Sequence, residues 1–166
     1  MAKMIPIAIT ILGYRGKYLF IQRKNPPYEG LWSMVGGKVN IGEHIYEAAI
    51  REVKEETNAP EVVDFSYRGV VSERLIDADN TLISHFLIFV GHASISEFNE
   101  DNREGCLTSF SLDEIQTKKD IFLPSDYEMF HRFLNVENAS SLHEAELLRD
   151  EKGYHLVYYR VPKNEY

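Results

Sequence analysis

The chain has 166 residues and a formal net charge of −8, with 44% hydrophobic and 27% charged residues. This composition is typical of a single globular domain with a buried core, and we expect residues 1–166 to form one domain. The negative charge argues against a protein that coats nucleic-acid polymers, since that task needs a basic surface. No apolar run reaches the roughly 20 residues that cross a bilayer, so no membrane partner is expected.

A cytoplasmic location is the expectation from two features of the sequence. The opening residues read as a strand and lack the pattern of a signal peptide. The single cysteine, Cys106, excludes an internal disulfide and fits a reducing compartment.

The first half of the chain predicts a hairpin, a loop and a helix. Residues 5–12 and 18–22 are β-branched and apolar, and a polar turn separates them, so they read as two strands. Residues 25–30 contain two prolines and end in a glycine, which is typical of a loop. Residues 44–57 have the apolar periodicity of a helix.

The second half predicts more strands, with a helix and a hairpin at about 124–162. The predicted elements are strands 62–74 and 81–93, a short helix 112–117, a longer helix 125–134, and a terminal hairpin of 145–149 with 154–160. Strands dominate and helices interrupt them, so we expect an α/β sandwich with a mixed sheet.

The central helix carries a predicted buried stripe beside an acidic arc. The stripe consists of Tyr46, Ala49, Ile50 and Val53. Glu52, Glu55 and Glu56 cluster on an arc of about 100° next to it. Their mutual repulsion costs about 0.2–0.5 kcal/mol for each pair, and a divalent cation would turn that repulsion into attraction. The alternative is a solvated acidic face compensated by neighbouring cations, which is the usual reading of such a helix.

The surrounding residues favour the cation. They read Gly37, Glu43, Arg51, Glu52, Val53, Glu55 and Glu56 in the spacing Gly-x5-Glu-x7-Arg-Glu-Val-x-Glu-Glu. This pattern resembles the Nudix box, which would occupy residues 37–59 here. The six residues of this set other than the apolar Val53 would coincide by chance roughly once in ten million starting positions. The box's final glycine is replaced by Asn58, the usual second choice for the left-handed residue that ends a helix.

The resemblance implies a Nudix-type α/β/α sandwich with a mixed β-sheet and a loop–helix–loop metal-binding motif. It also implies Mg²⁺ or Mn²⁺ as cofactor, held by oxygen ligands. Glu52 and Glu56 would be the principal ligands, assisted by Glu55 and the carbonyl of Gly37. Arg51 and Glu43 would form an orienting ion pair within the motif.

The chemistry implied by the resemblance is attack of a metal-activated water on a phosphorus atom of a pyrophosphate. Glu52 and Glu55 would be catalytic, and a further carboxylate would accept the water's proton. Family members often supply that carboxylate from the loop after the central strands, and here we favour Glu104. The other acids of that loop are Glu97, Glu100 and Asp101, and a solvated loop acid is the alternative for each.

Two later segments bear on the substrate. Residues 103–110 are similar to the Arg-Glu-Gly-x-Leu-x-Trp stretch of a Nudix branch that includes the 8-oxo-dGTP diphosphatases. Residues 123–126, Leu-Pro-Ser-Asp, lie where some of those enzymes place Trp-Pro-Asp-Asp. Asp126 would then bind a purine edge, although helix capping by Ser125 or Asp126 explains the same residues equally well. Arg23, at a strand end, would either meet a phosphate or remain an exposed charge.

The leading function is therefore a pyrophosphohydrolase that cleaves a nucleoside triphosphate, possibly an oxidised one, to monophosphate and pyrophosphate. The alternative substrate is ADP-ribose or a nucleotide sugar. A Nudix-fold sensor that binds a nucleotide without turnover is the third reading. The expected partner is a small-molecule nucleotide, and the terminal hairpin would either complete the sheet or form the edge of a homodimer.

Overall fold

The computed structural model describes residues 2–100, 105–136 and 142–161. Its elements in chain order are β1 (Met4–Tyr14), β2 (Lys17–Arg23), β3 (Trp32–Lys38), α1 (Ile45–Thr57), β4 (Val63–Asp77), β5 (Leu82–Ser94), β6 (Gly105–Phe110), α2 (Leu112–Thr117), a short 3-10 helix (Lys119–Ile121), α3 (Pro124–Phe133), β7 (Leu142–Asp150) and β8 (Gly153–Arg160).

The strands form one mixed sheet in the order β6-β2-β3-β1-β5-β4-β7-β8. β1 pairs with β5 and β4 pairs with β7 in parallel, whereas the other neighbouring pairs are antiparallel. The predicted opening hairpin is present, since β1 and β2 pair around the turn that joins Tyr14 to Lys17. The predicted mixed α/β fold is thus confirmed.

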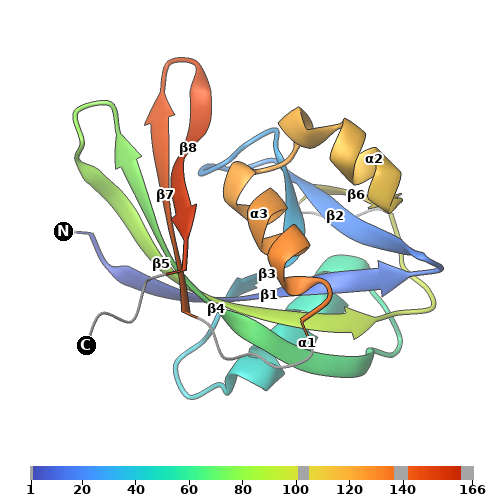
Figure 1. Cartoon of the computed structure of the whole chain (residues 1–166). Helices are drawn as coiled ribbons and strands as arrows, with labels where there is room; N and C mark the ends of the chain where they lie inside the picture. Colours follow the sequence, from blue (N-terminus) through green and yellow to red (C-terminus); the bar gives the residue numbers. More distant parts are fainter. Residues whose placement is uncertain (1, 101–104, 137–141, 162–166) are drawn as a thin grey trace.

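Helix α1 lies on one face of the sheet, and α2 and α3 lie on the other (Figure 1). The alternation of side chains along the strands explains this arrangement. In β2, Phe20 faces the core that contains Phe130 of α3, whereas Leu19 on the next position faces the core that contains Val53 of α1. Both faces of the central strands are therefore covered.

Helix α1 begins after His44 and ends at Asn58, whose φ of 54° and ψ of 24° are left-handed, as the sequence predicted. The predicted stripe was wrong at Tyr46, which is 57% exposed and packs edge-to-face on Phe65 at 5.1 Å between ring centroids. Ile50 is only half-buried. The residues that are buried are Ala48, Ala49, Glu52, Val53, Glu56 and Thr57.

The buried face of α1 is rotated toward the acidic arc because of the strand it packs against. β3 carries two glycines, Gly36 and Gly37, opposite the helix. Without Cβ atoms there, the backbone of β3 leaves room for the side chains of Glu52 and Glu56, which are 8% and 4% exposed. The helix consequently turns two glutamates inward rather than an aromatic residue.

The C-terminal hairpin extends the sheet beyond β4. β7 and β8 pair antiparallel around the turn at Asp150–Gly153, as predicted. β8 has no further strand neighbour in the described ranges, so the hairpin completes one end of the sheet. Among the described residues, no helix has the length and apolar character needed to cross a membrane.

Candidate active site

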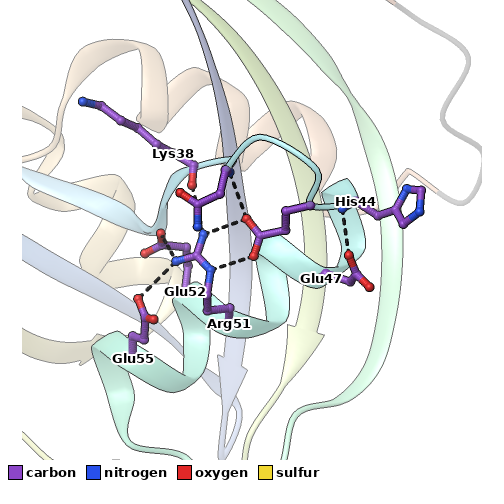
Figure 2. Close-up of polar contacts among 8 residues, drawn as sticks. Lys38, His44, Glu47, Arg51, Glu52 and Glu55 are labelled. Atoms are coloured by element: carbon purple, nitrogen blue, oxygen red, sulfur yellow. Dashed lines mark hydrogen bonds and ion pairs between the residues drawn. The ribbon is translucent and has the colours of Figure 1, made fainter.

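Arg51 joins three acidic residues of the box, Glu43, Glu52 and Glu55, into one network (Figure 2). Its Nε and Nη2 donate to the two carboxylate oxygens of Glu43 at 2.7 and 2.9 Å, which is the bidentate geometry that favours arginine. Its Nη1 donates to Glu52 at 2.7 Å and to Glu55 at 3.1 Å. A further bond runs from Nη2 to the carbonyl of Lys38 at 3.0 Å. Arg51 thus ties the helix to the loop that precedes it.

The same network sets the charge state of Glu43. Hydrogen bonds from Arg51 and from the backbone N–H of Asn40 lower the pKa of Glu43 to about 2. Its carboxylate in turn raises the pKa of Arg51 further above the ordinary range. Both groups are therefore ionised at any pH near neutrality, and the pair stays intact there.

Two glycines of β3 receive the inward-facing glutamates of α1. The backbone N–H of Gly36 donates to Glu56 Oε2 at 3.1 Å. A β-carbon built on Gly37 would lie 2.5 Å from the carboxyl carbon of Glu52. A β-carbon on Gly36 would overlap the backbone of β1 at Ala8 and Ile9. Only glycine fits either position, so these two residues bring the strand backbone against the helix carboxylates.

These residues fit a hard divalent cation in their chemistry. Glu52, Glu55 and Glu56 offer only oxygen donors, which Mg²⁺ prefers. The carboxyl group of Glu52 reaches the backbone of Gly37, where a carbonyl ligand was expected. Within the described residues, however, no three acidic, histidine or cysteine side chains converge as a ready-made cluster. Glu55 projects outward, its side chain 60% exposed, and Arg51 holds it together with Glu52.

The expected general base, Glu104, and its neighbour Asp101 lie outside the described residues. Of the other acids in that loop, Glu97 and Glu100 are both exposed. The residues on either side of the segment are close to the box. The N–H of Asn99 donates to the carbonyl of Thr57 at the end of α1.

A pocket of about 250 Å³ opens on the α3 side of the sheet and reaches the box glycines. The residues that line it come from the central strands, from the start of α3 and from the loop that follows β2. The lining residues are Ile7, Ile9, Arg23, Pro26, Pro27, Tyr28, Ser33, Met34, Gly36, Gly37, Lys38, Glu73, Phe86, Ile88, Leu123 and Asp126. The pocket is thus mostly apolar with a few polar groups, which is typical of a ligand site.

Two buried acids face this pocket. Asp126 accepts a hydrogen bond from the N–H of Met34 at 2.8 Å, and Glu73 accepts one from the hydroxyl of Tyr28 at 2.9 Å. Burial is the main cause that raises the pKa of Asp126 to about 7, and the neighbouring acid Glu73 is a secondary cause. Burial likewise raises the pKa of Glu73, which is 1% exposed, and of Tyr28. The pocket therefore favours protonated acids.

The structure places the two expected substrate residues at this pocket. Asp126 does not cap α3, since the helix begins at Pro124 and its end is without a side-chain cap among the described residues. The capping explanation for Ser125 and Asp126 was therefore wrong. Arg23 lies on the rim, where its Nε donates to the carbonyl of Pro27 at 3.0 Å. Arg23 also lines a smaller recess that contains Glu56, so it stands between the pocket and the box.

Sequence reasoning missed Glu73 and Tyr28. A signal for Glu73 was available, because Val71, Glu73 and Leu75 alternate on the buried face of β4. A charged residue in phase with core positions is costly unless it has a special role. Tyr28 gave no comparable signal, since it lies in a loop and is buried with a left-handed φ of 72°.

A family model described as NUDIX domain matches residues 3–133, which include the box and the pocket. The curated ADP-ribose pyrophosphatase of Methanocaldococcus jannaschii is 51% identical over 41 residues, 25% of this chain and 24% of that protein. An uncharacterised Nudix hydrolase of Bacillus subtilis is 28% identical over 102 residues, 60% of this chain and 61% of that protein. The matched segments thus span less than two thirds of either relative.

A MutT protein from Bacillus halodurans has a similar solved structure. The two chains superpose with a TM-score of 0.73 and 24% identity, covering 95% of this chain and 97% of the other. This likeness extends the shared fold beyond residue 133, so it includes part of the C-terminal hairpin. At this level of identity it bears on the fold alone.

Proposed function

Since this chain belongs to the Nudix family, we propose that it is a metal-dependent pyrophosphohydrolase that converts a nucleoside triphosphate to a monophosphate and pyrophosphate. The observation that carries the proposal is the position of Gly36 and Gly37. One side of these residues contacts the box carboxylates Glu52 and Glu56, and the other side lines the pocket. A nucleotide whose phosphates lie at the box would therefore have its base within reach of the pocket.

The charges support this division of the substrate. Besides Arg23 and Lys38, the pocket is lined by two buried acids and by several apolar side chains, among them Phe86 and Leu123, and this mostly apolar lining suits a base better than a phosphate group. The box is acidic as well, so phosphates would bind there only through a cation. Arg23 lies between the two regions and would meet a phosphate that bridges them.

The residues of the box would prepare the site for Mg²⁺ or Mn²⁺. Glu52 and Glu56 would be the main ligands, with Glu55 and the carbonyl of Gly37 assisting. When bound, the cation would activate a water and offset the charge that develops on the leaving phosphate. Arg51, anchored by its bidentate pair with Glu43, orients the carboxylate of Glu52.

A general base is still needed, and Glu104 remains our candidate. The described residues around it support this role. Asn99 is bonded to the end of α1, and Gly105 pairs with Arg23 at the end of β2. These two flanking residues therefore lie near the end of α1 and near Arg23. Glu104→Gln should lower kcat without changing the affinity for a nucleotide.

Product analysis tests the proposal. Purified protein with Mg²⁺ would be offered dNTPs, 8-oxo-dGTP, ADP-ribose and nucleotide sugars. We expect a monophosphate and pyrophosphate from one triphosphate well ahead of the others. The Glu56→Gln variant should remain folded and lose turnover, because the change is nearly isosteric but removes a charged ligand. Equal rates for this variant and the parent would contradict the metal site.

ADP-ribose is the second candidate substrate. The observation in its favour is the 51% identity over 41 residues to a protein named as an ADP-ribose pyrophosphatase. Turnover confined to ADP-ribose or a nucleotide sugar would establish this reading instead. Tight binding of one compound without turnover of any would point to a sensor.

A further inference from the structure

The carboxyl group of Glu73 is held at one oxygen and open at the other. Tyr28 donates its hydroxyl proton to Oε1 at 2.9 Å. The second oxygen, Oε2, is buried on the pocket side of β4 and has no hydrogen-bond partner in the part of the chain that the structure describes. The buried hydroxyl of Ser125 lies close enough to Glu73 to lower its pKa, but it does not reach the geometry of a hydrogen bond and is likewise without a partner there. Such orphaned groups are costly in a folded protein and call for an explanation.

A bound ligand would supply the missing partner. Burial raises the pKa of Glu73, and a carboxylate oxygen without a hydrogen-bond partner is costly in a buried wall, so the protonated form of Glu73 is favoured. Because Oε1 already accepts from Tyr28, the proton is placed on Oε2. The group that faces the pocket is then an O–H donor, which needs an acceptor atom on the ligand.

We propose that Glu73 is a specificity-determining residue that donates a hydrogen bond from Oε2 to a ring nitrogen or carbonyl of the substrate's heterocyclic base. This inference rests on the proposed function only in assuming that the ligand is a nucleotide. It applies equally to a nucleoside triphosphate and to ADP-ribose, since each carries such a base.

The surroundings of Glu73 suit a base better than a phosphate or a sugar. The ring of Phe86 and the side chains of Ile88 and Leu123 line the same pocket. Asp126 lines the same pocket as a second acid and is able to accept from an N–H, so the pocket presents both a donor and an acceptor. Nucleobases offer an adjacent acceptor and N–H donor on one edge. The volume, about 250 Å³, suits one part of a nucleotide rather than the whole.

The variant Glu73→Gln tests whether Glu73 donates a hydrogen bond to the ligand or accepts one. Tyr28 needs an acceptor, so it would hold the amide oxygen at the Oε1 position and direct the NH₂ group into the pocket. A glutamine there reproduces the neutral acid, whereas Glu73→Leu removes the donor. We expect Glu73→Gln to bind GMP and AMP within about threefold of the parent. Glu73→Leu should bind at least one of them about ten- to a hundredfold more weakly.

The measurement is equilibrium binding of GMP, AMP and inorganic tripolyphosphate in the presence of Mg²⁺. Tripolyphosphate lacks a base, so its affinity should be the same in all variants. Glu144→Gln is the matched control and should behave as the parent, since Glu144 is a partly exposed glutamate of β7 that pairs with Arg160 of β8. Thermal unfolding of each variant checks that it is folded.

Three results would overturn the proposal. If Glu73→Gln binds nucleotides as weakly as Glu73→Leu, the carboxyl group of Glu73 is not a hydrogen-bond donor. An unchanged affinity in Glu73→Leu would mean that Glu73 does not read the ligand. An equal loss for tripolyphosphate would indicate a structural role. If Glu73→Leu does not fold, Tyr28→Phe decides, since loss of the bond to Oε1 should weaken nucleotide binding and leave tripolyphosphate unaffected.

Failure of this inference and failure of the proposed function are distinguishable. Binding of monophosphates needs no hydrolysis, whereas the proposed function is tested by products from triphosphates. A protein that hydrolyses a triphosphate equally well as parent and as Glu73→Leu would retain its function and lose this role for Glu73. A protein that hydrolyses no triphosphate, and yet binds bases through Glu73, would retain this role for Glu73 and lose the proposed function.

Discussion

Gly37 and Glu52 lie so close that a β-carbon on the glycine would be 2.5 Å from the carboxyl carbon of the glutamate. Gly37→Ala should therefore displace the Glu52 carboxylate and lower kcat about a hundredfold, because a misplaced group near the reacting atoms is costly. Steady-state kinetics with saturating Mg²⁺ would measure this. Gly13→Ala is the control, since its β-carbon would meet the Ser94 hydroxyl at 3.3 Å, far from the box in sequence. Similar losses in both variants would contradict the prediction.

Arg51→Lys should raise the Mg²⁺ concentration that gives half-maximal activity. Lysine cannot reproduce the bidentate bonds to Glu43 while also reaching Glu52 and Glu55. Loss of such orienting bonds typically costs about ten- to a hundredfold in metal affinity. A titration of activity against Mg²⁺ would show it. Lys54→Arg, on the exposed side of the same helix, should leave the curve unchanged, and equal curves for Arg51→Lys and the parent would contradict the role of Arg51.

Asp126 should make the protein less stable as the pH rises from about 4 to about 7. Its pKa is raised from 3.8 to about 7 in the folded chain, so between these values the folded state binds more protons than the unfolded state. The free energy of unfolding then falls with pH, by at most about 1.4 kcal/mol per unit for one group. Asp126→Asn keeps an acceptor for Met34 and removes this titration.

Urea unfolding at pH 5 and pH 7 would give the free energy of unfolding of the parent and of Asp126→Asn. Raising the pH from 5 to 7 should therefore lower this free energy more in the parent than in the variant. Other groups titrate in both proteins and largely cancel in the comparison. A difference that is the same at both values would mean that Asp126 has an ordinary pKa.

Replacing Asn58 with glycine should destabilise the fold less than replacing it with alanine. Its left-handed conformation costs a residue with a β-carbon about 1–2 kcal/mol, and asparagine is among the few side chains that accept it. Asn58→Ala should lower the free energy of unfolding by about 1 kcal/mol, and Asn58→Gly should leave it equal or raise it. Thermal or urea unfolding of the two variants would decide, and identical stabilities would argue against the conformational explanation.

Local patterns in the sequence predicted most of the fold. Alternating apolar residues located the strands, and the box located α1 and its left-handed end at Asn58. The prediction was wrong where tertiary packing overrides periodicity. Tyr46 fits the apolar stripe of an isolated helix, but the glycines of β3 admit Glu52 and Glu56 instead, and the tyrosine is displaced outward. A helical wheel does not include the strand on which the helix will lie.

The pocket could not be predicted in the same way, because it unites segments far apart in the chain. Tyr28 and Glu73 are 45 residues apart, and Met34 and Asp126 are 92 residues apart. No short motif records such a contact. Asp126 was a candidate only through its resemblance to a family segment, and the alternative that it caps a helix was equally plausible until its partner was known.

The ring of Tyr28 has a second neighbour, Tyr154, on the turn side of the C-terminal hairpin, with 5.0 Å between ring centroids. Tyr154 lies beyond residue 133, where the match to the family model ends. The residue that holds Glu73 is thus supported by a part of the chain that the shared family pattern does not include. If Glu73 recognises a base as proposed, substitutions in the hairpin would alter that recognition through Tyr28 without touching the box, so ligand preference and chemistry would depend on separate segments of one chain.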